Sequence, residues 1–337
     1  MRLEAQLLLP PRERTPAEAL RRMGAVQAQD YPMARLALAL RSGEGGGAVE
    51  KAFRAGEILR THVLRPTWHF VAAADIRWML ALSAPRIMGQ TRSRDRKLGL
   101  DEKTFDKTGL ILEAALKNGT HLTKEELARR LEEAGIATDN YRLAHILMRA
   151  ELEALICSGI PRGKKQTWAL LAERAPDAQR YDAKTAAVLL ARRYFASRGP
   201  ATAGDFSWWS GLPGGTARKA ADALQEAGDF TARETGGLTL FFPKGLEVRR
   251  LPANLVHLLP AFDEYIISYR DRSAVLPEAS YSRAVSSNGI FHPVILRAGR
   301  AAGTWKRAAG KISLAFFDKN PPPALRRAVE KAASALP

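Results

Sequence analysis

Cysteine is almost absent from this sequence of 337 residues, since Cys157 is the only one. A single thiol excludes an intramolecular disulfide and any zinc site built from several cysteines. Cys157 lies in the apolar run "LEALICSG". We therefore expect a buried, unreactive thiol rather than a nucleophile.

Long apolar runs are also missing. No stretch approaches the length of a membrane span, and the first apolar segment is broken early by Pro10 and Pro11, which argues against a signal peptide. The 6 histidines are scattered, with no pair at metal-ligand spacing. These absences favour a cytoplasmic, nucleoid-associated protein with no metal and no other cofactor.

Acidic residues are scarce relative to basic ones. The sequence has 35 Asp and Glu against 52 Lys and Arg, a formal net charge of +17. Such an excess favours a polyanionic partner, either nucleic acid or an anionic membrane surface. The alternative is a solubilising surface in an organism whose proteins are rich in Arg and Ala.

One order of elements appears near the start of the chain. Thr15 and Glu18 form a capping-box pattern around Pro16, and this helix should end near Gly24. "AVQAQ" then reads as a short extended piece, and Asp30 as the cap of a second helix. A third helix ends near Gly56, followed by a hairpin that turns at Arg65-Pro66. This is the order of a winged helix.

The order recurs twice in stretches of about seventy residues, an ordinary size for a small domain. In the second copy Thr123 and Glu126 cap a helix, and "LICSGIPRGKKQTWALL" predicts two strands around a basic tip at Pro161–Lys165. The third copy ends in "FTARETGGLTLFF", where Gly236-Gly237 predicts a hairpin.

After Pro252 the pattern becomes mainly β, with strand-like segments in "NLVHLLPAFDEYIISYRDRS", "GIFHPVILRAGRAAGTWKR" and "KISLAFF", then a short final helix. The sequence thus predicts an α+β fold of three tandem winged-helix (helix-turn-helix) units plus a C-terminal β-barrel-like domain. The expected domains are residues 1–85, 86–175 (a basic linker and the second unit), 176–251 and 252–337.

The segment "GAVQAQDYP" places Gln27 and Gln29 two positions apart in an otherwise apolar stretch. Side chains at i and i+2 face apart in a helix but share one side of an extended segment. If the two amides act together, they do so from a strand or a loop.

Three segments resemble the AlkZ/YcaQ-like winged-helix family of bacterial alkylpurine DNA glycosylases. These are "RTPAEALRRMGAVQAQDYPMARLALALR", "LRPTWHFVAAADIRWMLALSAPR" and "LLPAFDEYIISYRDRS". The resemblance covers roughly residues 1 to 320 and implies three tandem winged helices plus a β domain around a DNA-sized channel. The family's catalytic motif is Gln, an apolar residue, then Gln. Gln27-Ala28-Gln29 is similar to it and resembles the AlkZ-like branch rather than the branch with Asp at the last position.

The resemblance implies that Gln27 and Gln29 are catalytic, by positioning water and stabilising charge at the sugar. An alkylated purine is already a cationic leaving group, so amide oxygens that orient water on C1′ can suffice. The alternative is that both glutamines hydrogen-bond loop backbone. Asp30 is expected to cap a helix. Asp263 and Glu264 are expected on a strand, in a structural role that pairs them with Arg270 or Arg272.

Contacts with DNA phosphates are expected from two basic stretches. The first, residues 86–97, contributes Arg86, Arg92, Arg94, Arg96 and Lys97, and the second, at the tip of the second hairpin, contributes Arg162, Lys164 and Lys165.

Aromatic and imidazole side chains offer further candidates. His69 could reach a groove from the first hairpin or be a buried core histidine. Trp208 and Trp209 could stack on bases or pack in a helix core.

The leading hypothesis is a monofunctional glycosylase that excises N-alkylated purines by water attack at C1′, with the unhooking of interstrand crosslinks as a further candidate reaction. It would act as a monomer on double-stranded DNA, largely independently of sequence. The alternative is a non-catalytic winged-helix DNA-binding protein or transcriptional regulator, although regulators usually pair one such unit with a sensor domain. An RNA-binding or scaffold role has no specific support.

Overall fold

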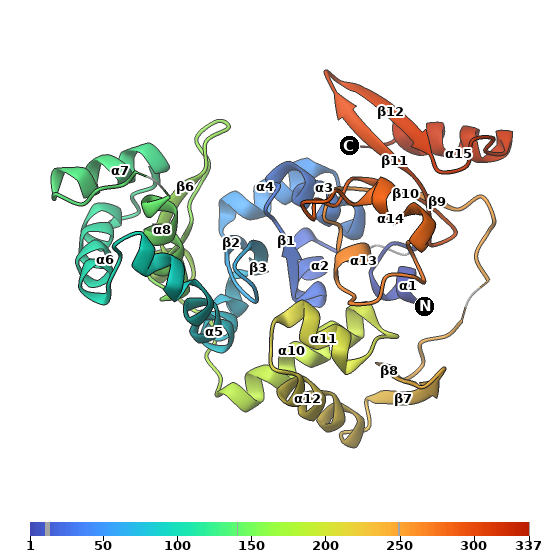
Figure 1. Cartoon of the computed structure of the whole chain (residues 1–337), viewed down its shortest axis with the longest axis horizontal. Coiled ribbons are helices and arrows are strands. Elements are labelled where there is room, and N and C mark those ends of the chain that lie inside the picture. Colours follow the sequence, from blue (N-terminus) through green and yellow to red (C-terminus); the bar gives the residue numbers. More distant parts are fainter. Residues whose placement is uncertain (11–13, 140, 249, 337) are drawn as a thin grey trace. The chain divides into compact units, whose positions relative to one another are not determined.

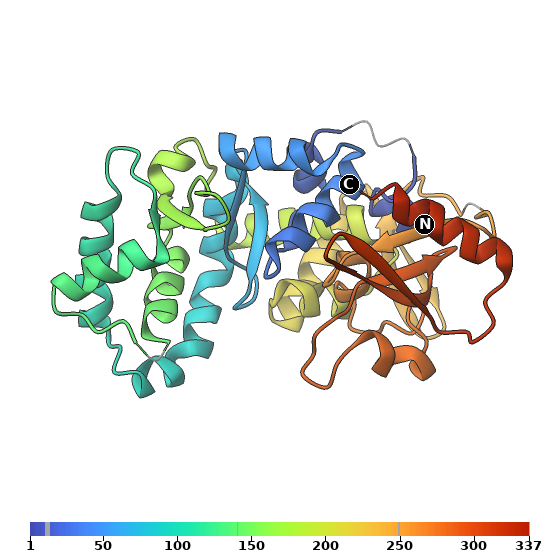
Figure 2. The same cartoon turned by 90° about the horizontal axis from the view of Figure 1, so that it is seen from above.

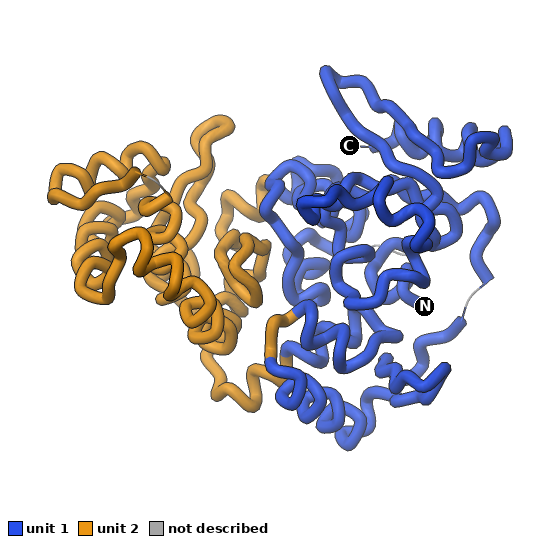
Figure 3. The backbone as a smooth tube through the Cα atoms, in the orientation of Figure 1, with its two compact units in different colours: residues 1–49, 190–209, 213–337 blue, residues 50–189, 210–212 orange. Residues whose placement is uncertain are grey.

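The computed structural model describes residues 1–10, 14–139, 141–248 and 250–336. The chain forms two compact units, coloured separately in Figure 3: unit 1 is residues 1–49, 190–209 and 213–337, and unit 2 is residues 50–189 and 210–212. Both units combine helices with antiparallel strands, so the predicted α+β class is confirmed. The division into the four predicted domains stays a prediction.

The N-terminal part of unit 1 follows the predicted order. It consists of α1 (Arg2–Ala5), α2 (Pro16–Met23), β1 (Ala25–Gln27) and α3 (Tyr31–Ser42). The Thr15 hydroxyl and the Glu18 carboxylate make the predicted capping box at the start of α2. Gly24 ends α2 with φ +75°, a conformation that side chains other than glycine rarely adopt. This glycine lets the chain leave α2 directly into β1.

A second part of unit 1 is helical and ends in a hairpin. Its elements are the C-terminal part of α10 (Ala183–Arg198), all but the last residue of α11 (Ala203–Ser210), α12 (Gly214–Glu226), β7 (Phe230–Thr235) and β8 (Leu238–Pro243). β7 and β8 pair antiparallel around Gly236 and Gly237, whose φ values of 58° and 74° suit a two-residue hairpin turn. The buried rings of Phe206 and Trp209 of α11 pack against Tyr194 of α10.

The C-terminal part of unit 1 contains an open sheet rather than a barrel. Its strands are β9 (Val256–Leu259), β10 (Val294–Arg297), β11 (Arg300–Ala308) and β12 (Lys311–Phe316), in the order β12-β11-β10-β9. β12 and β9 end the order at opposite edges, so the predicted barrel does not close in the described residues. α15 (Pro323–Ser334) lies against this sheet (Figures 1 and 2). Its Leu325 and Val329 are buried in one cluster with Ile295 and Trp305.

The segment between β9 and β10 contains helices where the sequence predicted a strand. "EYII" was predicted as strand, but it forms α13 (Glu264–Ile267), and α14 (Glu278–Ala284) follows. Asp263 caps α13 by accepting a hydrogen bond from the backbone N–H of Tyr265 at 2.8 Å. A continuous apolar run was compatible with either structure, and the cap decides it.

Unit 2 begins with most of α4 (Gly46–Ala55), continues with the β2 (Ile58–His62) and β3 (Trp68–Ala72) hairpin, the 3-10 helix η1 (Ala73–Asp75) and α5 (Ile76–Lys97). The hairpin is the predicted one. The predicted basic linker, residues 86–97, is instead the C-terminal half of α5, a continuous helix of 22 residues. None of the described helices, α5 included, is both long and apolar enough to cross a membrane.

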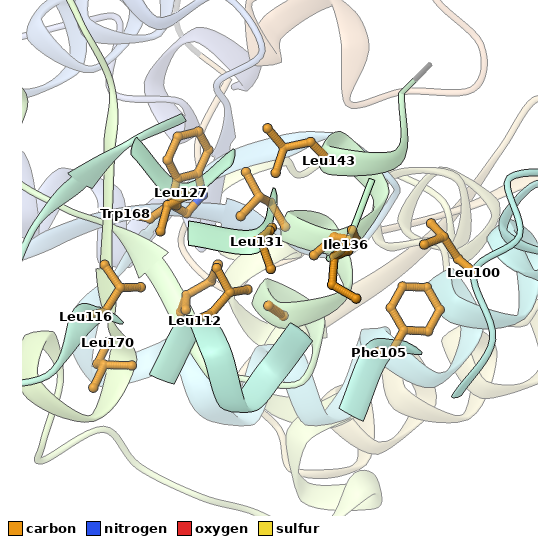
Figure 4. Packing of buried hydrophobic residues seen from close by; sticks show 14 residues of the cluster. Leu100, Phe105, Leu112, Leu116, Leu127, Leu131, Ile136, Leu143, Trp168 and Leu170 are labelled. Carbon is orange, nitrogen blue, oxygen red and sulfur yellow. The ribbon is translucent and has the colours of Figure 1, made fainter. Parts of the chain in front are cut away.

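The rest of unit 2 repeats the predicted order of helix, strand, helix, helix and two strands. The elements are α6 (Glu102–Leu116), β4 (Leu122–Thr123), α7 (Lys124–Glu133), α8 (Arg142–Leu152), β5 (Ile156–Ser158), β6 (Thr167–Leu170) and α9 (Leu171–Arg174). The strands form a sheet in the order β4-β6-β5. Figure 4 shows Leu112 and Leu116 of α6 in one buried cluster with Leu127 and Leu131 of α7.

Cys157 lies on β5 and is fully buried. Burial raises the pKa of its thiol to about 12, and the thiolate is the reactive form. We expect the native protein not to react with Ellman's reagent at pH 8, and the unfolded protein to react fully. Rapid labelling of the native protein would contradict the burial of this thiol.

Candidate functional site

The two glutamines lie where β1 ends and the chain turns into α3. Gln27 is the last residue of β1 and is 8% exposed, whereas Gln29 is exposed in the bend that follows. The backbone N–H of Gln29 donates to the Gln27 side-chain oxygen at 3.3 Å. Asp30 caps α3 by accepting from the Met33 backbone N–H at 3.1 Å, as predicted. The glutamines thus lie outside any helix, and the structure brings them into contact.

The positions of Gln27 and Gln29 bear on both interpretations of the pair, as catalytic residues and as residues that hydrogen-bond the loop backbone. The extended segment ends at Gln27, so Gln29 belongs to the turn rather than to the strand. The bond from the Gln29 backbone to Gln27 is of the loop-stabilising kind that the structural alternative expects. A carbonyl oxygen has two lone pairs, so this bond leaves Gln27 an acceptor position.

A buried ion pair fixes the backbone that carries Gln27. The carboxylate of Glu264 accepts the backbone N–H of Gln27 at 2.8 Å, and the guanidinium of Arg198 donates to the carbonyl oxygens of Met23 at 2.6 Å and Ala25 at 2.9 Å. Arg198 and Glu264 are joined at 2.7 Å, with both side chains 0% exposed. The strand is therefore held from α10 and α13, elements far from it in sequence.

The carboxylate of Glu264 is ionised despite its burial. Burial alone would raise its pKa, but Arg198, the hydroxyl of Ser268 and the Gln27 N–H favour the charged form and lower the pKa to about 2. Ser268 donates at 2.5 Å and the indole N–H of Trp209 at 3.0 Å. Trp209 is thus a buried core residue that also orients this carboxylate.

A second buried ion pair lies beside the first. Arg41 of α3 donates to both carboxylate oxygens of Asp263, at 2.7 and 2.8 Å, and to the side chain of Gln6 at 2.8 Å. The predicted partners of the Asp263-Glu264 carboxylates, Arg270 and Arg272, were therefore wrong. The true partners come from α3 and α10, and only the folded chain brings these helices to α13.

His69 is fully buried on β3 and hydrogen-bonds the carbonyl oxygen of Thr67 through a ring nitrogen at 3.0 Å. A side chain with no exposed surface cannot touch a DNA groove without a local rearrangement. The core interpretation of His69 fits this position, so His69 is not among the residues proposed to contact DNA.

The basic stretch of α5 presents its cations to solvent. Its only acidic residue, Asp95, is buried and contacts His145 at 2.5 Å and the hydroxyl of Thr91 at 3.0 Å. The five predicted DNA-contacting residues of the stretch are all exposed: Arg86, Arg92, Arg94, Arg96 and Lys97. The stretch is therefore a helical surface whose single acid is turned inward.

The basic tip between β5 and β6 is partly neutralised. Arg162 pairs with Glu126 at 2.8 Å and also donates to the carbonyl oxygen of His121, and Lys165 pairs with Glu125 at 3.4 Å. Lys164 is exposed, with no ion pair among the described residues. The sequence did not predict that the acids at the start of α7 would face this tip.

Arginines of α2 and α10 line a hollow of about 460 Å³ that was not predicted from the sequence. It is lined by Arg14, Glu18, Arg21, Arg22, Arg192, Arg193 and Ala196. Burial, and then the charge of Arg14, lowers the pKa of Arg22, and its buried Nε atom has no hydrogen-bond partner among the described residues. The sequence feature that could have indicated this hollow is an Arg-Arg doublet, which occurs in two distant helices at residues 21–22 and 192–193.

No group of three or more His, Cys, Asp and Glu side chains in the described part of the chain could hold a metal ion. The groups that the structure places near the glutamines are their own amides, the carboxylate of Asp30 that caps α3 and the buried Arg198–Glu264 ion pair.

The family model described as DNA glycosylase AlkZ-like matches residues 20–337. The chain belongs to the AlkZ-like DNA glycosylase family. The matched region contains Gln27, Gln29 and the ion pair that holds the strand ending at Gln27.

Two comparisons from Streptomyces sahachiroi agree with this membership. A curated protein named interstrand DNA cross-link repair glycosylase is 26% identical over 318 residues, which cover 90% of this chain and 85% of that protein. The solved structure of the DNA glycosylase AlkZ superposes with a TM-score of 0.81 at 23% identity, covering 99% of this chain and 93% of that one. The structural comparison establishes a shared fold.

Proposed function

We propose that this AlkZ-like protein is a monofunctional DNA glycosylase that hydrolyses the bond between C1′ and the base nitrogen of N-alkylated purines in duplex DNA. The observation that carries the proposal is the contact between Gln27 and Gln29 in a turn that belongs to the matched family region. The name of the curated relative extends the proposed substrates to interstrand crosslinks.

The reaction needs little acid catalysis from the protein. A purine alkylated at N7 or N3 carries a positive charge, so it leaves readily as the sugar becomes oxocarbenium-like. The remaining tasks are to hold the nucleotide, to stabilise the cationic sugar and to place water at C1′. Amide oxygens can accept hydrogen bonds from that water and present the negative ends of their dipoles to the sugar.

In this proposal Gln27 and Gln29 orient the water and stabilise the sugar together. Asp30 is engaged as the cap of α3, so we give it no role as a base. The residues next to the glutamines include no lysine, which supports hydrolysis rather than an amine-linked lyase step. The motif also supports assignment to the branch that has Gln at both positions.

We further propose that the three repeated groups of elements are winged-helix units that bind DNA through its phosphates. The order of α6, β4, α7, α8, β5 and β6 in unit 2 supports this for the second group. The exposed cations of α5, Lys164 and the arginine hollow are the proposed phosphate contacts. Clustered like charges repel one another, and a phosphate backbone removes that penalty.

The decisive experiment is release of free N7-methylguanine from alkylated duplex DNA, with the wild-type protein and the Gln27→Ala, Gln29→Ala double variant. Release by the wild type and strong loss in the double variant support the proposal. A wild type that binds the duplex but releases no base from alkylated or crosslinked DNA would leave a non-catalytic DNA-binding protein or regulator.

The arginine hollow is expected to contribute to the salt dependence of the affinity for DNA. Each neutralised phosphate contributes about 0.9 to the slope of log affinity against log salt. We expect Arg14→Gln with Arg21→Gln to reduce that slope by up to about 1.8, measured by fluorescence anisotropy on an undamaged duplex. The control is the same loss of two charges at the exposed residues Lys103 and Lys124. If the two double variants reduced the slope equally, the hollow would not be a specific site of DNA contact.

Neutralising the basic residues of the tip between β5 and β6 should change the salt dependence of DNA binding less than their number suggests. Arg162 and Lys165 already have carboxylate partners, so a phosphate must displace these before it gains a new contact. Neutralising both together with Lys164 should therefore flatten the slope by about 0.9, the value for one phosphate rather than three. An unchanged slope would place the tip outside the DNA contact.

A further inference from the structure

Two elements far apart in sequence, α10 and α13, meet at the backbone of residues 23–27, which includes β1. Arg198 ends α10 and binds the carbonyl oxygens of Met23 and Ala25, while Glu264 begins α13 and accepts the N–H of Gln27. These bonds involve alternate residues along the segment 23–27. They fix both its position and its rotation about its own axis, which sets the direction in which the Gln27 side chain leaves the backbone.

The ion pair that makes these bonds is itself held in place. One carboxylate oxygen of Glu264 accepts from Arg198, Ser268 and Trp209, at 2.7, 2.5 and 3.0 Å, while the other accepts from Gln27. The Arg198 Nε atom donates to the same Ser268 hydroxyl at 2.8 Å. The pair is thus a rigid support rather than a mobile contact.

An apolar replacement could fill the same volume, and buried ion pairs are often replaceable in this way without loss of stability. It could not, however, accept the N–H of Gln27 or donate to the carbonyl oxygen of Ala25. Those backbone groups would be left without partners, and the strand would shift to find new ones. A displacement of about 1 Å in a catalytic group can cost about 10² in rate.

We propose that Arg198 and Glu264 are positioning residues of the active site, which set the placement of Gln27 by holding the backbone of residues 23–27. The inference rests on the proposed function of Gln27. It assigns a task to the "LLPAFDEYIIS" segment, which contacts neither the sugar nor the base in this proposal.

The chain contains a matched control. Arg41 and Asp263 form an ion pair with the same 2.7 Å separation and the same 0% exposure, and Asp263 is the N-cap residue that precedes Glu264 at the start of α13. Among the described residues, no side-chain hydrogen bond of this pair reaches residues 23–29; apart from the bonds between the two partners, they go to Ala37, Gln6 and Tyr265. The two pairs thus differ in their contact with β1 but not in burial.

The test compares Glu264→Gln with Asp263→Asn, two isosteric changes that each break one of these pairs. Three quantities are measured at a temperature where both variants are folded: urea unfolding, affinity for undamaged duplex and the single-turnover rate of N7-methylguanine release. We expect similar losses of stability and unchanged affinity in both. We expect the release rate to fall at least about 10-fold in Glu264→Gln and less than about 2-fold in Asp263→Asn.

A second arm separates positioning from general loosening of the fold. In a Gln27→Ala background the placement of this side chain no longer matters, so Glu264→Gln should cause little further loss of rate. The same fractional loss in both backgrounds would overturn the proposal, as would a normal rate in Glu264→Gln or an equal loss in Asp263→Asn. Absence of release by the wild type itself would instead refute the proposed function.

Discussion

Replacing Gln27 or Gln29 by Ala is expected to slow excision of N7-methylguanine by about 10² or more, the scale of losing one preorganised electrostatic contact. The reason is that each amide oxygen has to be in place before the bond breaks, when water must meet the sugar at C1′. In the structure the Gln27 oxygen already accepts the Gln29 backbone N–H at 3.3 Å. The two residues therefore form one local unit.

The loss in the double variant should be smaller than the product of the two single losses. Residues that act on one water and one sugar contribute as a unit, so removing the first disables much of what the second does. Single-turnover rates for the two single variants and the double variant, on duplex DNA carrying N7-methylguanine, measure this directly.

Binding provides the control for these variants. Affinity for undamaged duplex comes mainly from phosphate contacts, and neither glutamine carries a charge. We expect both single variants to bind undamaged DNA as the wild type does. Full excision by the double variant would return Gln27 and Gln29 to a role in holding the loop, and the catalytic groups would have to be sought elsewhere.

Local signals in the sequence were sufficient for most helices and hairpins. The Thr15 and Glu18 capping box, the Asp30 cap and the Gly236-Gly237 turn all act within a few residues, and all were predicted and found. Such signals do not depend on the rest of the fold. They could therefore be recognised without a structure.

The errors occurred where a distant partner decides the structure. "EYII" has the composition of a strand, but the Asp263 cap and the ion pairs with Arg41 and Arg198 hold it as a short helix. The predicted barrel failed for a similar reason, because closure depends on pairing between edge strands that no local pattern specifies.

The candidate site was predictable in part. The Gln-x-Gln spacing located the glutamines and their non-helical setting. The ion pair that holds the backbone of Gln27 could not be predicted, because Arg198 and Glu264 are separated from Gln27 by more than half of the chain. The arginine hollow depends in the same way on the packing of α2 and α10, which brings two Arg-Arg doublets to one place.

Removing one partner of the buried ion pair should destabilise the protein strongly. We expect Arg198→Ala to lower the free energy of unfolding by about 3–5 kcal/mol, because Glu264 would stay buried without its counter-charge. The matched surface change is Arg218→Ala, which breaks the exposed Arg218–Asp222 pair on α12. This change should cost no more than about 1 kcal/mol, since solvent screens exposed pairs. Urea unfolding followed by circular dichroism compares the two variants.

The same pair predicts a pH dependence of stability. The pKa of Glu264 is about 2 in the folded protein against an ordinary value of 4.5, so the unfolded chain takes up the proton first as pH falls. The stabilisation from this carboxylate is therefore complete above pH 4.5 and is lost as the pH falls toward 2. Glu264→Gln cannot titrate, so its free energy of unfolding should decline less than that of the wild type over this range. Parallel declines would mean that Glu264 is protonated at its ordinary pKa, and that the carboxylate does not hold the Gln27 strand as a charged group.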